Sequence, residues 1–501
     1  MHGSNGIHHR RPSGSMSLRR KLIYGFGFWL LLSQVILPIF FHLQIEKDGS
    51  SNLGPPGTSG KADGFFNTIP VSLETKPFHS TVHCVGETHQ ESTAWMYRSC
   101  HFSYLCFDTN SSEFVLVASP REQGLQKRLV PDSFVSTSTN TTVALGGINP
   151  RWKGKDFNQG IHKVEWFPRI LPKPPKEYYM LPSSVLLIPF HSFAAHNVGH
   201  LLWDDFLPIY TLLQMFGLTG MSKLMLRVVL PPGELLYGTC EMRRNKGKKC
   251  ATNFEKFLPL LGIDPHTFST TRDVSFTATF GKRSVPQYVC AKQGVAGLGM
   301  LTDHGNSDHG WDPERNQGLA TPVQNVAKGP LLYNFRNYMV HNLVLPLVPP
   351  PQSKFRIVLS AHSSNDGARD VTFDNQFRSL SKAFPAASVE TLQLSNLTLK
   401  EQVELASTTT IFVTTCGGGA MTATFLPRGA SLILFYQASG GFNFAQFNET
   451  GGPAYLDWDL FNNAAYLRVH WLPIESMNTR EGLETLMYLV NHEMDVSSNL
   501  L

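Results

Sequence analysis

The sequence lacks the cysteine pattern of a structural zinc site, because no C-x-x-C motif pairs with a second one or with an H-x-x-x-H motif. The chain also lacks a large excess of positive or negative charge. Its formal net charge is +5, part of which comes from the N-terminal tail, so the composition gives no reason to expect nucleic-acid binding. Charged residues make up only 16% of the chain and hydrophobic residues 42%, which is typical of a globular protein. At 501 residues the chain exceeds the ~250–300 residues at which a single core stops growing, so we expect two lobes.

One apolar run is long enough to cross a membrane. Residues 1–21 carry arginines and a lysine but no acidic residue, and residues 22–43 are almost wholly apolar. This length matches the ~20 residues of a transmembrane helix, and the basic flank predicts a cytoplasmic N-terminus. A cleaved signal peptide is the alternative. The run exceeds the ~7–15 residues of a signal core and no clear small-x-small cleavage site follows it, so we favour an uncleaved type II anchor.

The rest of the chain has the features of a lumenal protein. Residues 44–80 are rich in Gly, Ser, Pro and Thr and predict a flexible stem. All seven cysteines follow the apolar run, where a lumenal location would allow disulfides to form. Cys240 and Cys250 could close a basic loop, which we expect to be a solvated turn rather than an anion site. Because seven is an odd number, at least one cysteine keeps a free thiol unless two chains are cross-linked. The sequence also contains four acceptor sequons for N-glycosylation, at Asn110, Asn140, Asn396 and Asn448.

A proline-rich stretch, residues 345–352, is the candidate boundary between two lobes, 81–345 and 355–501. The first lobe has a mixed pattern, with strands expected at 185–190 and 224–230, a loop at 294–310 and helices at 253–261 and 329–344. In the second lobe strands and helices alternate, and a terminal helix is expected at 478–494. Such alternation predicts a parallel sheet covered by helices, whose ligands lie beyond the carboxyl ends of the strands.

The first chemical motif is the polar triplet Asn197, His200 and Asp204, which follows the apolar run 185–190. Spacings of three and four place these side chains on one helix face. An amide, an imidazole and a carboxylate at a strand-to-helix junction suit acid–base chemistry. The alternative is a helix N-terminus with ordinary capping groups. Pro208 predicts a bend near Asp204.

The second motif is a glycine turn, Gly417, Gly418 and Gly419, between an apolar strand and a short helix that runs toward Phe425. Glycines let backbone N–H groups approach a ligand, and a helix N-terminus attracts phosphate. The alternative is a tight turn with no ligand, since a single glycine-rich turn is weak support.

The pattern Asn-x-x-His-x-x-x-Asp-x-x-x-Pro of residues 197–208, together with the strand, glycine turn and Phe-Leu-Pro-x-Gly-Ala of residues 411–430, resembles glycosyltransferase family 61. This family includes plant xylan arabinosyl- and xylosyltransferases and an animal protein O-mannose N-acetylglucosaminyltransferase. The resemblance implies an α/β fold of the GT-B type, with two Rossmann-like lobes facing a cleft, after the membrane anchor and stem. It implies an inverting transfer from UDP-xylose, UDP-arabinose or UDP-GlcNAc to a glycan or glycoprotein hydroxyl, in the Golgi or ER membrane.

The resemblance also implies roles for single residues. Asp204 is expected to be the general base, His200 to orient it or bind beside it, and Asn197 to bind the acceptor or hold His200; Asp205 is the reserve base. The donor diphosphate is expected to contact Arg369 and the turn formed by Cys416, Gly417, Gly418 and Gly419. No metal ion is required if arginine and a helix dipole supply the positive field.

Two departures from the family pattern keep other hypotheses open. Cys416 stands where the family has a histidine, and Arg369 comes several residues later than expected. A glycan-binding relative without activity is therefore the second hypothesis. The third is a metal-dependent transferase that uses Asp457 and Asp459, which form an Asp-x-Asp triplet.

Overall fold

Two large β-sheets and the helices around them make up the part of the protein that the computed structural model describes. Both belong to one compact unit, residues 66–501. The predicted tail, membrane anchor and most of the stem lie outside the described residues, and among the described helices none is both long and apolar enough to span a bilayer. The described residues are 73–86, 98–119, 124–130, 141–150, 161–192, 195–229, 240, 244–265, 268–271, 286–297, 328–347, 355–363, 370–436 and 455–498.

The N-terminal lobe is built on a ten-stranded sheet whose main path runs β11-β10-β9-β12-β3-β4-β7, with β1, β2 and β8 paired beside it. Its strands are β1 (Leu73–Glu74), β2 (Thr81–Gly86), β3 (Arg98–Asp108), β4 (Glu113–Val117), β7 (Arg169–Leu171), β8 (Tyr178–Met180), β9 (Val185–Phe190), β10 (Ser222–Arg227), β11 (Ser269–Thr270) and β12 (Tyr288–Gly297). A separate hairpin pairs β5 (Val143–Pro150) with β6 (Ile161–Trp166).

This sheet is mixed, which differs from the Rossmann-like lobe that we expected. Strands β9, β10 and β11 are parallel, as in a Rossmann unit, but β3 pairs antiparallel with β2, β4 and β12. The physical reason is local for β3 and β4, because a short turn joins them and only antiparallel strands can be joined in that way. The helices of this lobe are α3 (Leu125–Leu129), α4 (Val198–His200), η4 (Leu201–Phe206), α5 (Leu207–Met215), α6 (Arg244–Phe257), η5 (Leu258–Leu261) and α9 (Gly329–Asn342).

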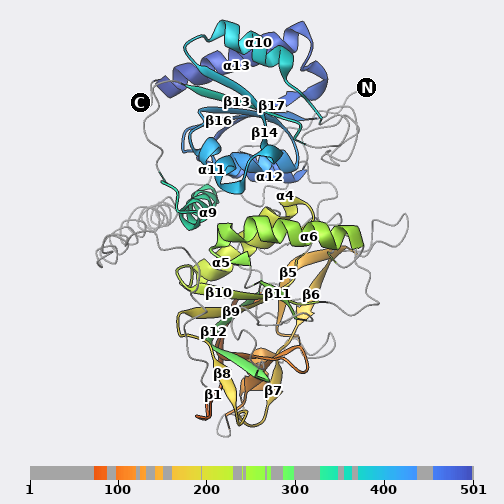
Figure 1. Cartoon of the computed structure of the whole chain (residues 1–501), viewed down its shortest axis with the longest axis vertical. Helices are drawn as coiled ribbons and strands as arrows, with labels where there is room; N and C mark the ends of the chain where they lie inside the picture. The colour runs from red at the N-terminus through yellow and green to blue at the C-terminus, as the bar shows by residue number, and fades with distance from the viewer. Residues whose placement is uncertain are drawn as a thin grey trace, which may run out of the picture. The chain divides into compact units, whose positions relative to one another are not determined.

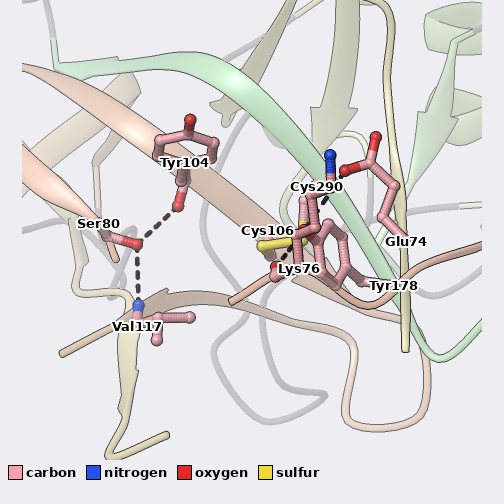
Figure 2. Close-up of a disulfide and its surroundings, with 8 residues drawn as sticks. All are labelled: Glu74, Lys76, Ser80, Tyr104, Cys106, Val117, Tyr178 and Cys290. Carbon is pink, nitrogen blue, oxygen red and sulfur yellow. Dashed lines mark hydrogen bonds between the residues drawn. A yellow bond between two sulfur atoms is a disulfide. The ribbon is translucent and has the colours of Figure 1, made fainter. Parts of the chain in front are cut away.

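Disulfides join the antiparallel strands. Cys84 and Cys100 face each other across β2 and β3, and Cys106 faces Cys290 across β3 and β12. Around the second bond, Figure 2 shows the Tyr178 hydroxyl, which donates a 2.6 Å hydrogen bond to a backbone carbonyl near the first strand. The lobe is thus closed covalently at its centre. The third disulfide, Cys240–Cys250, forms as the sequence allowed. The basic segment that it closes is not the solvated turn that we expected, because residues 244–249 belong to helix α6.

The C-terminal lobe is a fully parallel sheet with strand order β14-β13-β15-β16-β17, which confirms the parallel arrangement predicted from the sequence. Its strands are β13 (Arg356–Ala361), β14 (Ser388–Gln393), β15 (Ile411–Thr415), β16 (Ser431–Tyr436) and β17 (Arg468–Pro473). Its helices are α10 (Asp374–Ala383), η8 (Leu394–Asn396), α11 (Leu399–Ser407), η9 (Gly418–Phe425), α12 (Tyr455–Asn463), η10 (Ile474–Ser476) and α13 (Arg480–Ser498).

Helices cover both faces of this sheet, as Figure 1 shows for α10 and α13 on one side and α11 and α12 on the other. Alternate strand residues explain this, because successive side chains of a strand point to opposite faces. Leu359 and Val413 pack with residues of α10 and α13, whereas Val358 and Phe412 pack with those of α11 and α12. The sequence Thr398-Leu-Lys-Glu401 has the signature of a capping box, and α11 begins with one: the side chain of Thr398 accepts from the N–H of Glu401, whose carboxylate accepts from the N–H of Thr398.

One hydrophobic core connects the two lobes through α9. Leu186 of β9, Phe335 of α9 and Phe412 of β15 belong to the same cluster of buried residues. In the middle of this helix, the fully buried Arg336 donates hydrogen bonds to the carbonyls of Leu347 and Phe425. The helix expected at residues 329–344 therefore forms and fastens the C-terminal lobe to the chain that precedes it.

Candidate active site

The candidate site begins where β9 ends. All six residues of β9 are buried, so the strand is a rigid support for the chain that follows it. Asn197 is the N-cap of α4, and its Oδ1 accepts a 3.0 Å hydrogen bond from the N–H of Gly199. Asn197 thus has the capping role that was the alternative to a chemical one. The residue also lines the large pocket described below.

The helix widens directly after α4. Residues Leu201–Phe206 form a π-helical turn, in which the N–H of Leu207 donates to the carbonyl of Leu202, five residues back. Pro208 has no N–H to donate and would clash with the carbonyl four residues earlier in a regular α-helix, so the wide turn relieves the conflict. The irregularity lies where the sequence predicts a bend, and such turns are frequent at functional sites.

His200 and Asp204 meet on one face of this helix, as their spacing predicts. The Nδ1 atom of His200 lies 2.5 Å from Oδ2 of Asp204. The Asp204 side chain is only 1% exposed, whereas that of His200 is 26% exposed. Of the two groups, it is therefore the imidazole that solvent or a substrate can reach.

Asp205 points elsewhere. Its Oδ2 accepts a 2.6 Å hydrogen bond from the hydroxyl of Ser192, which follows β9, and its side chain is buried. Ser192 also accepts from the N–H of Ala195, at 3.3 Å. The Asp205 carboxylate thus ties the π-helical turn to the end of the strand.

The glycine turn packs tightly against the loop after β13. Gly417 has φ +118°, a backbone conformation that side-chain-bearing residues rarely adopt, and a Cβ on Gly419 would lie 2.5 Å from the Cβ of Ser363. A Cβ on Gly418 would meet nothing within 4 Å. Cys416 is buried in the core, and its N–H donates to the carbonyl of Phe435, so it continues the sheet rather than lining the pocket.

These elements surround a cavity of about 780 Å³. In an open sheet of order 2-1-3-4-5, ligands bind where the strand order reverses, which here is between β13 and β15. The lining comes from the carboxyl ends of β13, β14 and β15, from α11 and η9, and from α4 and α6 of the N-terminal lobe. The residues are His196, Asn197, Val198, Leu202, Lys249, Lys256, Phe257, His362, Ser363, Gln393, Leu394, Ser395, Leu399, Gln402, Gly418, Gly419, Met421, Thr422 and Phe425.

The charged groups of this lining are basic. Lys249 and Lys256 contribute ammonium groups, and among the described residues that line the cavity there is no aspartate or glutamate. Burial lowers the pKa of Lys256 from its ordinary value. His362 has a left-handed backbone, φ +51°, and its Nδ1 contacts the carboxylate of Asp370. The sequence analysis did not identify the two lysines or the two pocket histidines, His196 and His362, as site residues. The seven-residue spacing of the lysines could have indicated that they share one helix face.

The remaining predicted residues are distributed as follows. Arg369, Asn140 and Asn448 lie outside the described residues, and Asn110 and Asn396 are exposed. Asp457 is 5% exposed within α12, which also contains Asp459. Within the described ranges no group of three His, Cys, Asp or Glu side chains has an arrangement that suits a metal ion.

One segment of the chain matches a known protein family. Residues 317–433 match the family model Glycosyltransferase 61, a segment that contains α9, the strands β13, β14 and β15, and the glycine turn. This match supports the resemblance to glycosyltransferase family 61 that the sequence motifs predicted, and the matched segment contains the second of them, the glycine turn. Comparison with curated proteins gives no significant match.

Among solved structures, the protein is similar to the dodecameric iron-containing heptosyltransferase TibC in complex with ADP-D-β-D-heptose. The identity is 12%, the TM-score is 0.28, and the match covers 86% of this chain and 100% of that one.

Proposed function

We propose that the protein is an inverting, metal-independent glycosyltransferase that transfers a sugar from a nucleotide-sugar donor to a hydroxyl of a glycan or glycoprotein. UDP-xylose, UDP-arabinose and UDP-GlcNAc are the candidate donors. The observation that carries this proposal is the 780 Å³ cavity, which combines the carboxyl ends of parallel strands with the start of the His200 helix. Its size suits a small-molecule ligand.

On the acceptor side, we assign the general base to His200. In an inverting transfer the acceptor oxygen attacks the anomeric carbon, the bond from that carbon to the diphosphate breaks, and the hydroxyl proton passes to Nε2 of His200. Asp204 holds Nδ1 and thereby fixes the tautomer and orientation of the ring, which is the usual division of labour in such pairs. This exchanges the roles expected from the sequence, because the near-complete burial of Asp204 favours an orienting function.

On the donor side, the diphosphate is assigned to the glycine turn. Gly418 has open space where a side chain would stand, and its turn opens the eight residues of η9. Backbone N–H groups at such a position suit phosphate oxygens. Divalent cations prefer carboxylate and carbonyl oxygens, and the described part of the lining supplies lysines instead of carboxylates, which supports an anion bound without a bridging metal ion.

Two lobes that share one cavity support a GT-B-type arrangement, although the N-terminal sheet is mixed. Three disulfides and the exposed sequons at Asn110 and Asn396 support an oxidising, lumenal location such as the Golgi or ER. The single-pass type II anchor at residues 22–43 belongs to the same proposal and rests on the sequence alone.

The test is a panel of UDP-sugars offered to the purified domain that follows the apolar run, with binding and hydrolysis measured in parallel. We expect one donor to bind and to be hydrolysed slowly, with or without chelator. Activity that disappears with chelator and returns with manganese would instead favour the metal-dependent hypothesis. The His200→Gln variant is the control for chemistry, since it should keep donor binding.

A second candidate function is a glycan-binding relative without transferase activity. The observation that favours it is the burial of Cys416, which removes the side chain at the family's histidine position from the pocket. The same panel separates the two candidates. Glycan binding without binding or hydrolysis of any nucleotide sugar would support the second one.

A further inference from the structure

Helix α6 presents two lysines and an asparagine along one face. Lys249, Asn253 and Lys256 are spaced by four and three residues, so they lie one above another on the helix surface. Both lysines line the cavity at the candidate active site. Lys248 is exposed on the neighbouring face and is not among the residues that line this cavity.

Asn253 fastens this face to the start of the catalytic segment. Its Nδ2 donates a buried 2.7 Å hydrogen bond to the carbonyl of Ala195, two residues before the N-cap Asn197. The bond lies between the two lysines along the helix. It therefore holds the second half of the helix, which carries Lys256, against the strand-to-helix junction.

The disulfide Cys240–Cys250 fastens the first half of the same helix. Cys250 follows Lys249 directly, and both sulfur-bearing residues are buried in the core that connects the lobes. A Cβ on Gly247 would lie 3.1 Å from the carbonyl of Cys240, so the closed loop also packs closely on the helix. The bond thus restricts the backbone on which Lys249 stands.

The C-terminal lobe lines the cavity with neutral donors. Gly418 and Gly419 come from the turn after β15, and Ser363 from the loop after β13. A ligand that contacts both α6 and the glycine turn needs negative charge near the lysines and hydrogen-bond acceptor oxygens near the turn. A diphosphate has both properties, and ammonium groups are effective point charges for phosphate.

Resting on the proposed function, we propose that Lys249 and Lys256 of the N-terminal lobe bind the diphosphate of the donor together with the glycine turn, and that the Cys240–Cys250 disulfide is a positioning element for Lys249. The donor is then held by both lobes at once. The positive field that many transferases obtain from a divalent ion comes here from two side chains.

The experiment measures binding of UDP, of inorganic pyrophosphate and of uridine to the purified domain by calorimetry at two salt concentrations. Lys256→Met and Lys249→Met should each weaken UDP and pyrophosphate about tenfold and reduce the salt dependence, as expected for hydrogen bonds to charged groups. Uridine binding should not change. Lys248→Met is the matched control, one residue away on the same helix, and should bind UDP as the wild type does.

The disulfide is tested by a double-mutant cycle with Cys240→Ser/Cys250→Ser, after a melting curve has shown that the variant is folded. Without the disulfide, Lys249→Met should have little further effect on UDP affinity, whereas Lys256→Met should keep its full effect, since Asn253 still holds that part of the helix. Equal effects in both backgrounds would overturn the positioning role. If the cysteine variant does not fold, the single lysine variants still decide whether α6 binds the diphosphate.

The outcomes separate this inference from the proposed function. Wild-type protein that binds UDP while the lysine variants bind it equally well overturns the inference and leaves the transferase proposal standing. Binding of pyrophosphate but not of UDP supports the lysine site and contradicts a uridine donor. Binding of neither probe contradicts both.

Discussion

His200 and Asp204 form a pair in which the partly exposed imidazole covers a buried carboxylate, with 2.5 Å between Nδ1 and Oδ2. A proton that arrives from the acceptor therefore reaches the partly exposed imidazole before the buried carboxylate. The first prediction concerns which of them accepts the proton from the acceptor hydroxyl.

His200→Gln should reduce turnover by about 10²–10⁴, the usual share of general base catalysis, because glutamine can donate to Asp204 but cannot take up a proton. Asp204→Asn should act on the same step, so the double variant should be less impaired than the product of the two single losses. Steady-state kinetics on the best donor checks both. Near-normal turnover of His200→Gln together with an inactive Asp204→Asn would return the role of base to Asp204.

Asp205→Asn is the matched control for this pair. Its carboxylate contacts Ser192 behind the helix, so the substitution should lower the melting temperature and leave turnover within a few-fold of wild type. Loss of turnover with an unchanged melting temperature would contradict this assignment.

The second prediction separates backbone strain from ligand contact within the glycine turn. Gly417→Ala forces a side chain into φ +118° and should cost about 1–3 kcal/mol of stability. Gly418→Ala meets open space, so it should fold normally but place a methyl group in the cavity and raise the KM for the donor several-fold. Melting curves and donor titrations of the two variants form the test, and equal KM values for Gly418→Ala and wild type would mean that no donor lies against this turn.

The third prediction concerns acid stability. The Glu493 side chain of α13 is 1% exposed and contacts Ser431, Arg468 and His470. Burial alone would raise its pKa, but the hydrogen bonds from Ser431 and Arg468, together with the charge of Arg468, lower the pKa below its ordinary value of 4.5. A carboxyl with a depressed pKa in the folded state stabilises the fold at neutral pH, and this contribution disappears as the pH falls below about 4.5.

Melting temperatures between pH 7 and pH 3.5 check this expectation. Glu493→Gln should be less stable by about 2–4 kcal/mol at pH 7, because it leaves the charge of the half-buried Arg468 uncompensated. It should also show a flatter decline toward acid. A variant that declines as steeply as the wild type would show that other carboxylates govern acid stability.

The fourth prediction concerns glycans. Asn110 lies in the turn between β3 and β4 and Asn396 ends η8, and both are exposed. Asn396 directly follows Ser395, which lines the cavity. If the domain is lumenal, glycosidase should increase gel mobility, and Asn396→Gln should change the KM for a large acceptor while Asn110→Gln should not. Unchanged mobility of the secreted or membrane-bound protein would argue against occupied sites.

Elements with local sequence signals could be predicted in both lobes. The strand expected at residues 185–190 of the N-terminal lobe forms as β9, and in the C-terminal lobe the capping box of Thr398 and Glu401 starts a helix. The contact of His200 with Asp204 also follows from spacing alone. Each of these features depends on residues that are close in sequence, for which periodicity and capping rules hold.

The missed features depend on partners that are distant in sequence. The loop expected at residues 294–310 is wrong for its first four residues, which belong to β12. A Cβ on Gly294 would lie 2.5 Å from Leu105 on the neighbouring β3, so this glycine serves close strand packing that composition cannot reveal. Likewise, the role of α6 depends on Asn253 and Ala195, 58 residues apart, and the burial of Asp204 depends on the whole lobe.

The Cys106–Cys290 disulfide has a consequence for how this protein is made and how it breaks. Its two cysteines are 184 residues apart, and the candidate catalytic helix and α6 both lie inside the ring that they close. In the chain-entropy description, such a ring raises the free energy of the unfolded chain by about 5 kcal/mol, because it removes conformational entropy. During synthesis the ring cannot close before residue 290 has emerged, and by then the candidate catalytic segment has emerged as well. A protease that later cuts between the two cysteines releases nothing: both fragments stay in one molecule until a reductant separates them.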